Sequence, residues 1–209
     1  MKPPPRKDSS RHIGRGRWTC RHRCLSPRLA AVGIAWLLLG LSSMHGQRAK
    51  PTEYEVKATY LYNFSRFVEW PAKVTHAQGG SFVICVLGKD PFGASLNAIL
   101  ADEATTGKTV VAQRIPTPQD AVNCRVLFIS SSEDTHLKQI LATLGQASVL
   151  TVSELPEFTQ RGGMVQFVSD GNRVRFEVNL ASAEHAGLTL SSELLKVAVN
   201  VRRTARLGD

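Results

Sequence analysis

The sequence predicts an α/β domain with a Rossmann-like architecture: an open, mostly parallel sheet covered by helices on both faces, with a C-terminal antiparallel hairpin. One observation is that continuous apolar runs, such as 81–87 and 125–129, are too short for helices and rich in branched residues. A second is that these runs alternate with helical segments, which favours parallel strands joined by right-handed crossovers. A third is that a strictly alternating segment, 173–178, follows a cluster of turn residues.

The first element is an amphipathic helix over 52–71. Thr52 and Glu55 have the spacing of a capping box, and Pro71 ends the helix because the residue before a proline avoids the helical conformation. The apolar residues at helical spacing that we expect to face the core are Val56, Tyr60, Phe64 and either Phe67 or Val68. The segment holds six of the chain's fourteen aromatic residues, so the rest of the fold must bury a large apolar surface here.

The middle of the chain alternates predicted strands with predicted helices. The expected strands are 81–87, 108–115, 125–129 and 148–152. The expected helical segments are 92–101, a short turn over 117–121, and 130–144. Asp90 is expected to cap the first of these helices with Pro91 at its first position, and Gly145 ends the last one.

The C-terminal part of the chain departs from this alternation. Segments 164–168 and 173–178 flank a turn cluster and predict an antiparallel hairpin. In the second strand apolar and charged residues alternate, so one face is exposed, which is typical of an edge strand. The remaining expected elements are a helix over 180–186 capped by Asn179 and a last helix over 191–200.

The positive charge of the chain is concentrated in its first 28 residues. They carry nine Lys or Arg and one acid, which accounts for +8 of the formal +9. The remainder is nearly balanced, so net charge gives no support to a nucleic-acid-binding function.

Thirteen uncharged, mostly apolar residues follow at 29–41, the length of a signal-peptide core. We expect cleavage between Ser43 and Ala49, with an uncleaved amphipathic anchor as the alternative. The predicted organisation is therefore a basic leader with signal peptide at 1–46, a single domain at 47–202 and a frayed tail at 203–209.

The cysteines fall into two pairs. Cys20 and Cys24 lie in the leader, at a spacing that matches no zinc motif. Cys85 and Cys124 are an even pair in a domain that we expect to be exported, which favours a disulfide because exported compartments are oxidising. Two buried free thiols are the alternative, since free cysteine is a common core residue.

No residue set in the sequence supports catalysis, a metal or a cofactor. There is no Gly-x-Ser-x-Gly motif, and the histidines of the predicted domain are widely separated. The loop 88–93 precedes a helix but lacks a phosphate-binding pattern, and Asp90 within it would repel an anion. Glu133 and Asp134 lie in the first turn of a predicted helix, where carboxylates complement the helix dipole. We expect a non-enzymatic protein.

Two groups of residues are candidates for binding. Arg173 and Arg175, on the exposed side of a strand, suit an anionic ligand or an acidic partner surface, and protection of an edge strand explains them equally well. The second group lies along the first helix and comprises Asn63, Arg66, Glu69 and Trp70. Partner contact is one interpretation of this group, and capping and solvation of the helix is the other.

The run Lys-Ala-Thr-Tyr-Leu-Tyr-Asn-Phe-Ser-Arg-Phe-Val-Glu-Trp-Pro at 57–71 resembles the opening signature of the YfiR family, periplasmic regulators of membrane-bound diguanylate cyclases. The resemblance extends over about 54–201. The further blocks that carry it are 82–88 with 90–92, 124–130, 162–167, 172–179 and 186–195.

The resemblance implies a non-enzymatic periplasmic repressor that binds the periplasmic part of an inner-membrane diguanylate cyclase. Repression would lower cyclic di-GMP signalling and biofilm growth until an outer-membrane lipoprotein or a redox change releases it. Cys85 and Cys124 match a disulfide position of the family, whereas the second cysteine pair of some members is missing here. We expect a homodimer, no cofactor and no nucleic acid. Related domains serve as input modules of sensor kinases, so the alternative is a periplasmic small-ligand sensor that feeds a sensor kinase.

Overall fold

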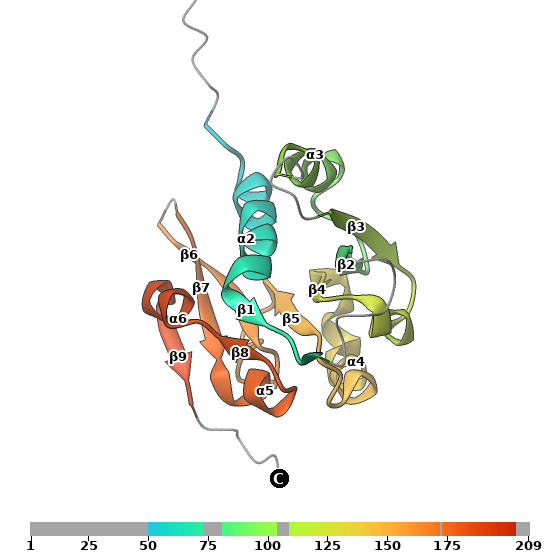
Figure 1. Cartoon of the computed structure of the whole chain (residues 1–209), viewed down its shortest axis with the longest axis vertical. Coiled ribbons are helices and arrows are strands. Elements are labelled where there is room, and N and C mark those ends of the chain that lie inside the picture. Colours follow the sequence, from blue (N-terminus) through green and yellow to red (C-terminus); the bar gives the residue numbers. More distant parts are fainter. Residues whose placement is uncertain (1–49, 73–80, 104–108, 172, 204–209) are drawn as a thin grey trace, which may run out of the picture. The chain divides into compact units, whose positions relative to one another are not determined.

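The computed structural model describes residues 50–72, 81–103, 109–171 and 173–203 (Figure 1). The chain divides into two units, Met1–Ala49 and Lys50–Asp209, and all described residues belong to the second. The predicted signal peptide and its cleavage site lie outside the described residues. No helix of the described part is both long and apolar enough to span a bilayer.

The main sheet has seven strands in the spatial order β3-β2-β4-β5-β6-β7-β9. Their bounds are Phe82–Leu87 for β2, Val110–Ile115 for β3, Val126–Ile129 for β4, Leu150–Ser153 for β5, Val165–Asp170 for β6, Arg173–Asn179 for β7 and Asn200–Arg202 for β9. Strands β2 to β6 pair in parallel, β7 is antiparallel to β6, and β9 is parallel to β7. The predicted open, mostly parallel sheet with a C-terminal antiparallel hairpin is confirmed.

Helices cover both faces of this sheet. Their bounds are Glu53–Phe67 for α2, Ala94–Glu103 for α3, Leu137–Leu144 for α4, Leu180–His185 for α5 and Ser192–Val197 for α6, with 3-10 helices at Pro118–Asn123 (η3) and Ser131–His136 (η4). Side chains from α2, α3, α5 and α6 share one core with the sheet, and those of η3 and α4 share a second core. Figure 1 shows α2 lying between α3 and the hairpin of β6 and β7.

Helix α2 begins as predicted. Thr52 caps it, the Glu55 amide donates to Thr52 Oγ1 at 3.3 Å, and the Thr52 amide donates to Glu55 Oε2 at 2.7 Å. The helix ends four residues before Pro71, because Val68 and Glu69 form a short strand, β1 (Val68–Glu69), that pairs with β8 (Thr189–Leu190).

The buried face of α2 differs from the predicted one. Phe64 and Val68 are buried as expected, but Val56 and Tyr60 are only partly buried and Phe67 is 36% exposed. The helix has neighbours on two sides, α3 and the β6–β7 hairpin, so its buried arc is wider and rotated towards Lys57, Ala58, Leu61, Tyr62, Phe64 and Ser65. Aromatic contacts hold this face to the hairpin: the Phe64 ring stands edge-on to Phe176, with centroids 5.8 Å apart.

The second core contains the disulfide. Cys85 in β2 and Cys124 just after η3 are bonded, with Cα atoms 5.8 Å apart and both side chains buried. The bond joins β2 to the segment that enters β4, so the disulfide interpretation of this pair is confirmed and the free-thiol alternative is wrong.

Several predicted boundaries are wrong for tertiary reasons. The first helix after β2 begins at Ala94, because Asp90 accepts the amides of Phe92 and Gly93 in a turn, and Pro91 therefore lies before the helix. The helix predicted over 130–144 begins as the 3-10 helix η4 before α4. The last helix stops at Val197, since the next residues form β9 beside β7. Strand β7 is consequently an edge only over its first half.

Candidate functional site

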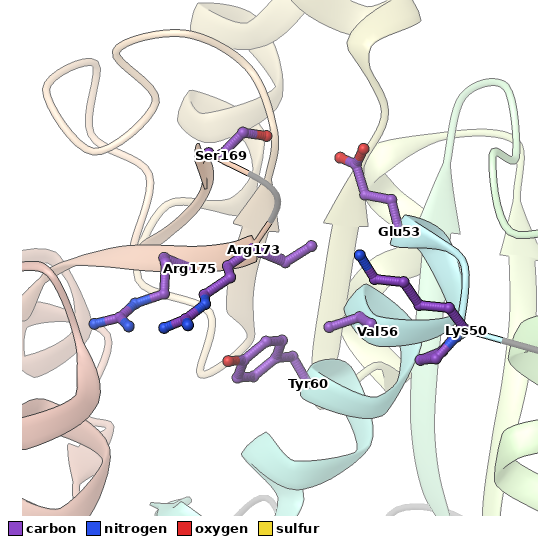
Figure 2. A pocket seen from close by; sticks show the side chains of 10 residues that line it. Lys50, Glu53, Val56, Tyr60, Ser169, Arg173 and Arg175 are labelled. Carbon is purple, nitrogen blue, oxygen red and sulfur yellow. The ribbon is translucent and has the colours of Figure 1, made fainter.

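A pocket of about 540 Å³ lies between the N-terminal half of α2 and the β6–β7 hairpin (Figure 2). Helix α2 contributes Val56 and Tyr60, and the residues leading into it contribute Lys50. Strand β7 contributes Arg173 and Arg175, two residues apart on one strand. The structure therefore brings both arginines predicted from the sequence into one pocket with residues from the first helix.

Tyr60 belongs to the core and to the pocket at once. Its ring packs against Phe176 with centroids 5.5 Å apart and against Phe167 at 6.0 Å, so the apolar body of the side chain is held by the hairpin. The side chain is only partly buried, and Figure 2 shows its hydroxyl end directed towards the side of the pocket on which Arg173 and Arg175 lie. A tyrosine in this arrangement offers both an apolar surface and a hydrogen-bonding group.

The pocket is positively charged. Among the described residues, Lys50, Arg173 and Arg175 form no ion pair. The acid in the lining, Glu53, is engaged elsewhere, because its carboxylate contacts the Lys57 ammonium at 2.6 Å. Three cations are thus left to attract an anionic group, most strongly where two arginines act together.

The second predicted group is not part of this pocket. Asn63 is partly buried, while Arg66 and Glu69 are exposed near the C-terminal end of α2 and in β1. Trp70 packs edge-on against Phe82, with centroids 5.2 Å apart, and its buried Nε1 has no hydrogen-bond partner among the described residues. The structure shows a packing role for Trp70, and the binding role of all four residues stays a prediction.

A buried ion-pair cluster fixes the start of α2 to the sheet. Lys57 is 4% exposed, and its ammonium contacts Glu154 Oε2 at 2.5 Å in addition to Glu53. The Tyr54 hydroxyl donates to the other Glu154 oxygen at 3.3 Å. Sequence reasoning missed this cluster, because the pairing of Lys57 with Glu53 is visible at four residues' spacing but Glu154 lies 97 residues away.

The surroundings in this cluster raise the pKa values of two of its side chains. Burial acts to lower the pKa of Lys57, but hydrogen bonds with Glu154 and Glu53 outweigh it and hold the pKa above its ordinary value of 10.5. Burial, reinforced by the negative charge of Glu154, raises the pKa of Tyr54 above 10.0. Both groups therefore keep their protons at neutral pH, and Lys57 is a cation.

A further pocket, of about 440 Å³, lies at the carboxyl ends of β2 and β4. This is where the strand order reverses, the usual ligand position in open α/β sheets. Its polar groups are largely used within the protein: Asp90 pairs with Arg114 at 2.8 Å, and Ser132 Oγ accepts the Lys89 amide at 3.0 Å. Among the described residues there is no cluster of His, Cys, Asp and Glu able to hold a metal.

Two solved structures to which this chain is similar share little of its sequence. A conserved domain protein from Vibrio cholerae O1 biovar eltor is 12% identical, with a TM-score of 0.48, and the match covers 72% of this chain and 60% of that one. An ABC domain in complex with L-Trp from Streptococcus pneumonia is 12% identical with a TM-score of 0.45, over 69% of this chain and 60% of that one. The chain thus spans less than two thirds of either protein.

The sequence as a whole matches a known family. A family described as DUF4154, YfiR/HmsC-like, matches residues 54–199, which include α2 from its second residue, the disulfide and every strand of the main sheet except β9. The chain belongs to the YfiR/HmsC-like family.

Proposed function

We propose that this protein is an exported, non-enzymatic regulator that binds the periplasmic part of an inner-membrane diguanylate cyclase and represses it, which lowers cyclic di-GMP signalling and biofilm growth. The observation that carries the proposal is the family match over 54–199. The Cys85–Cys124 disulfide supports export to an oxidising compartment. The basic segment 1–28 followed by the apolar run 29–41 is typical of an export signal. The periplasmic part of a sensor kinase is the related alternative partner.

Repression of this kind works by population shift. A bound regulator favours the inactive conformation of the membrane enzyme only as far as it binds that conformation more tightly than the active one. A hundredfold preference corresponds to about 2.7 kcal/mol, enough to silence an enzyme that is otherwise evenly divided between two states. No covalent step, cofactor or nucleic acid is needed. Release by an outer-membrane lipoprotein and assembly as a homodimer belong to the same proposal.

Crosslinking in intact cells tests the partner directly. The full chain with a C-terminal tag is crosslinked, purified from envelope fractions and its partners identified by mass spectrometry. We expect a membrane protein with a diguanylate cyclase or sensor kinase domain. The matched control is the same chain without residues 1–46, which stays in the cytosol and should recover no such partner. Recovery of neither class of membrane protein by the exported chain would contradict the proposal.

A small-ligand sensor is the second candidate, favoured by the pocket at the carboxyl ends of β2 and β4. A thermal-shift screen with nucleotides and amino acids separates the two. A ligand present at a hundred times its Kd adds about 2.7 kcal/mol of stability and should raise the Tm by several degrees. The repressor proposal predicts no such shift from these compounds.

A further inference from the structure

The first half of β7 presents an unpaired backbone edge. Strand β9 pairs with β7 only over Glu177–Asn179, and no other described strand lies beside Arg173–Phe176 on that side. The Val199 amide donates to the Phe176 carbonyl on the β9 side at 2.9 Å, whereas the Asn179 amide donates to Met164 on the β6 side at 2.7 Å.

These two bonds fix which way the backbone of β7 points. Backbone groups of successive residues in a strand face opposite sides, so Val174 faces the same side as Phe176. Its amide and carbonyl therefore point to the open edge, where the described residues supply no partner. An edge of this kind is a template for one more strand.

Apolar surface lies along this open edge. Val174 and Tyr60 line the pocket, and Val56 extends it along α2. At the other end of the edge Val199 is 44% exposed and the nearby Val197 is 55% exposed. A segment laid against β7 would therefore cover apolar side chains as well as gain backbone hydrogen bonds.

The charges at the edge decide what that segment is. Arg173 and Arg175 alternate with Val174, and Lys50 adds a third cation without an ion pair among the described residues. A second copy of this chain fits poorly: antiparallel pairing about a two-fold axis at Val174 would set Arg173 of each copy opposite Arg175 of the other. Like charges directly opposite destabilise a strand pair, whereas carboxylates in those positions stabilise it.

We propose that the open edge of β7 binds an extended acidic segment of the partner protein by strand addition. Side chains two residues apart on a strand share a face, so acids at alternate positions would meet Arg173 and Arg175. The residue between them is apolar and enters the pocket beside Tyr60, while the backbone pairs with Val174. The proposal rests on the proposed function for the existence of a partner protein, and it names the chemistry of that partner's contact segment.

Peptide binding to the exported full chain tests the edge itself. The probe is a fluorescent peptide Thr-Glu-Val-Glu-Val-Thr, followed by anisotropy at low and moderate salt. We expect it to bind more weakly as salt rises, since the contact is partly electrostatic. Thr-Lys-Val-Lys-Val-Thr should bind at least about tenfold more weakly, because its lysines carry the same charge as the two arginines. Thr-Glu-Pro-Glu-Pro-Thr should also bind at least about tenfold more weakly, because it keeps the negative charge but its prolines lack the backbone amides of the two valines.

Two protein variants of equal charge change localise the site. R173E/R175E should weaken binding of the acidic peptide at least about tenfold, whereas K89E/K138E, which alters exposed lysines outside the pocket, should not. Hydrogen exchange reports backbone pairing separately from charge attraction. The acidic peptide should slow exchange of the Val174 amide if the two strands pair. Equal binding by both double variants, or an unchanged Val174 amide, would overturn the proposal.

The same R173E/R175E variant separates this proposal from the proposed function. If the crosslinked membrane partner is recovered equally by R173E/R175E and the unaltered chain, the strand-addition proposal is wrong and the proposed function stands. If the unaltered chain recovers no cyclase or kinase, the proposed function is wrong whatever the peptide does. Self-association of the unaltered chain in sedimentation that Val174→Pro abolishes would show that this edge pairs copies of the chain, and would also overturn the proposal.

Discussion

Two regions of the main sheet are built differently. In the first region β2 and β4 lie inside the sheet and are parallel, and their last four residues are buried, with the Cys85–Cys124 disulfide on one face and side chains of α2 and α3 on the other. In the second region β7 runs antiparallel to β6, its first three residues are exposed or partly buried, and no described strand pairs with its first half on the side away from β6. The first region has little surface to offer a partner, and the second offers backbone, charge and apolar surface together.

We infer that stability and recognition are carried by separate parts of one domain. The buried strands and the disulfide hold the fold, so the hairpin can keep an exposed edge without putting the whole fold at risk. Helix α2 joins the two parts, because it packs on both α3 and β7 and lines the pocket with Tyr60. Substitutions can therefore alter either region alone or the contacts of α2 that link them.

The largest effect is expected from removing the disulfide. Cys85→Ala with Cys124→Ala frees a loop of 39 residues, which should lower the free energy of unfolding by about 4 kcal/mol in the loop-entropy treatment. The Tm should fall by roughly 10 °C. Calorimetry measures the Tm of the double variant, with the reduced unaltered chain as the control. The folded double variant should bind the acidic peptide normally, and loss of that binding would contradict the separation of the two regions.

The next effect concerns the link between α2 and the sheet. Lys57→Met keeps the buried stem but leaves the Glu154 carboxylate without its cation, which should cost about 3 kcal/mol of unfolding free energy. Glu53→Gln removes the exposed partner of the same lysine and should cost less than about 1 kcal/mol. Urea unfolding of both variants measures the difference. Equal costs would show that the Glu154 contact does not secure α2.

A matched pair of prolines tests the backbone direction of β7. Arg175→Pro removes an amide that faces β6 beside Val168, and should cost at least about 2 kcal/mol more than Val174→Pro, whose amide faces the open edge. Both prolines impose the same backbone angle, so the comparison isolates the hydrogen bond. Urea unfolding decides the ranking. The reverse ranking would mean that Val174 is paired and that the edge is closed.

The smallest effect is a pH dependence confined to alkaline solution. The pKa values of Lys57 and Tyr54 are raised on folding, so their contribution to stability is complete below about pH 10 and is lost as the pH rises through the folded values. The unfolding free energy of the unaltered chain should therefore fall above pH 10. The fall should be shallower in Lys57→Met. An equally steep fall of the unfolding free energy in the unaltered chain and in Lys57→Met would show that other groups cause the loss of stability at alkaline pH.

Much of the fold was predictable because its signals are local. The run Val126–Ile129 is buried on both faces and is therefore continuously apolar, and the Thr52 and Asn179 caps depend on residues three positions away. Strands β1, β8 and β9 were not predicted, because segments of two or three residues become strands only through their distant partners.

The candidate site was predictable only in part. Alternation along one strand singled out Arg173 and Arg175, but nothing local indicates that Tyr60 and Lys50 join them, since α2 meets the hairpin more than 100 residues further along the chain. The burial of Lys57 was not predicted for the same reason. A lysine in a helix is expected to be solvent-exposed, and only the fold shows that Glu154 lies beside it.

We propose that the exported domain represses a membrane enzyme by docking, and the cellular concentration of cyclic di-GMP tests this proposal. Deletion of the gene should raise the concentration of cyclic di-GMP. The full chain should restore the original concentration, and the chain without residues 1–46 should not. An unchanged concentration after deletion, or full restoration by the chain that stays in the cytosol, would contradict it.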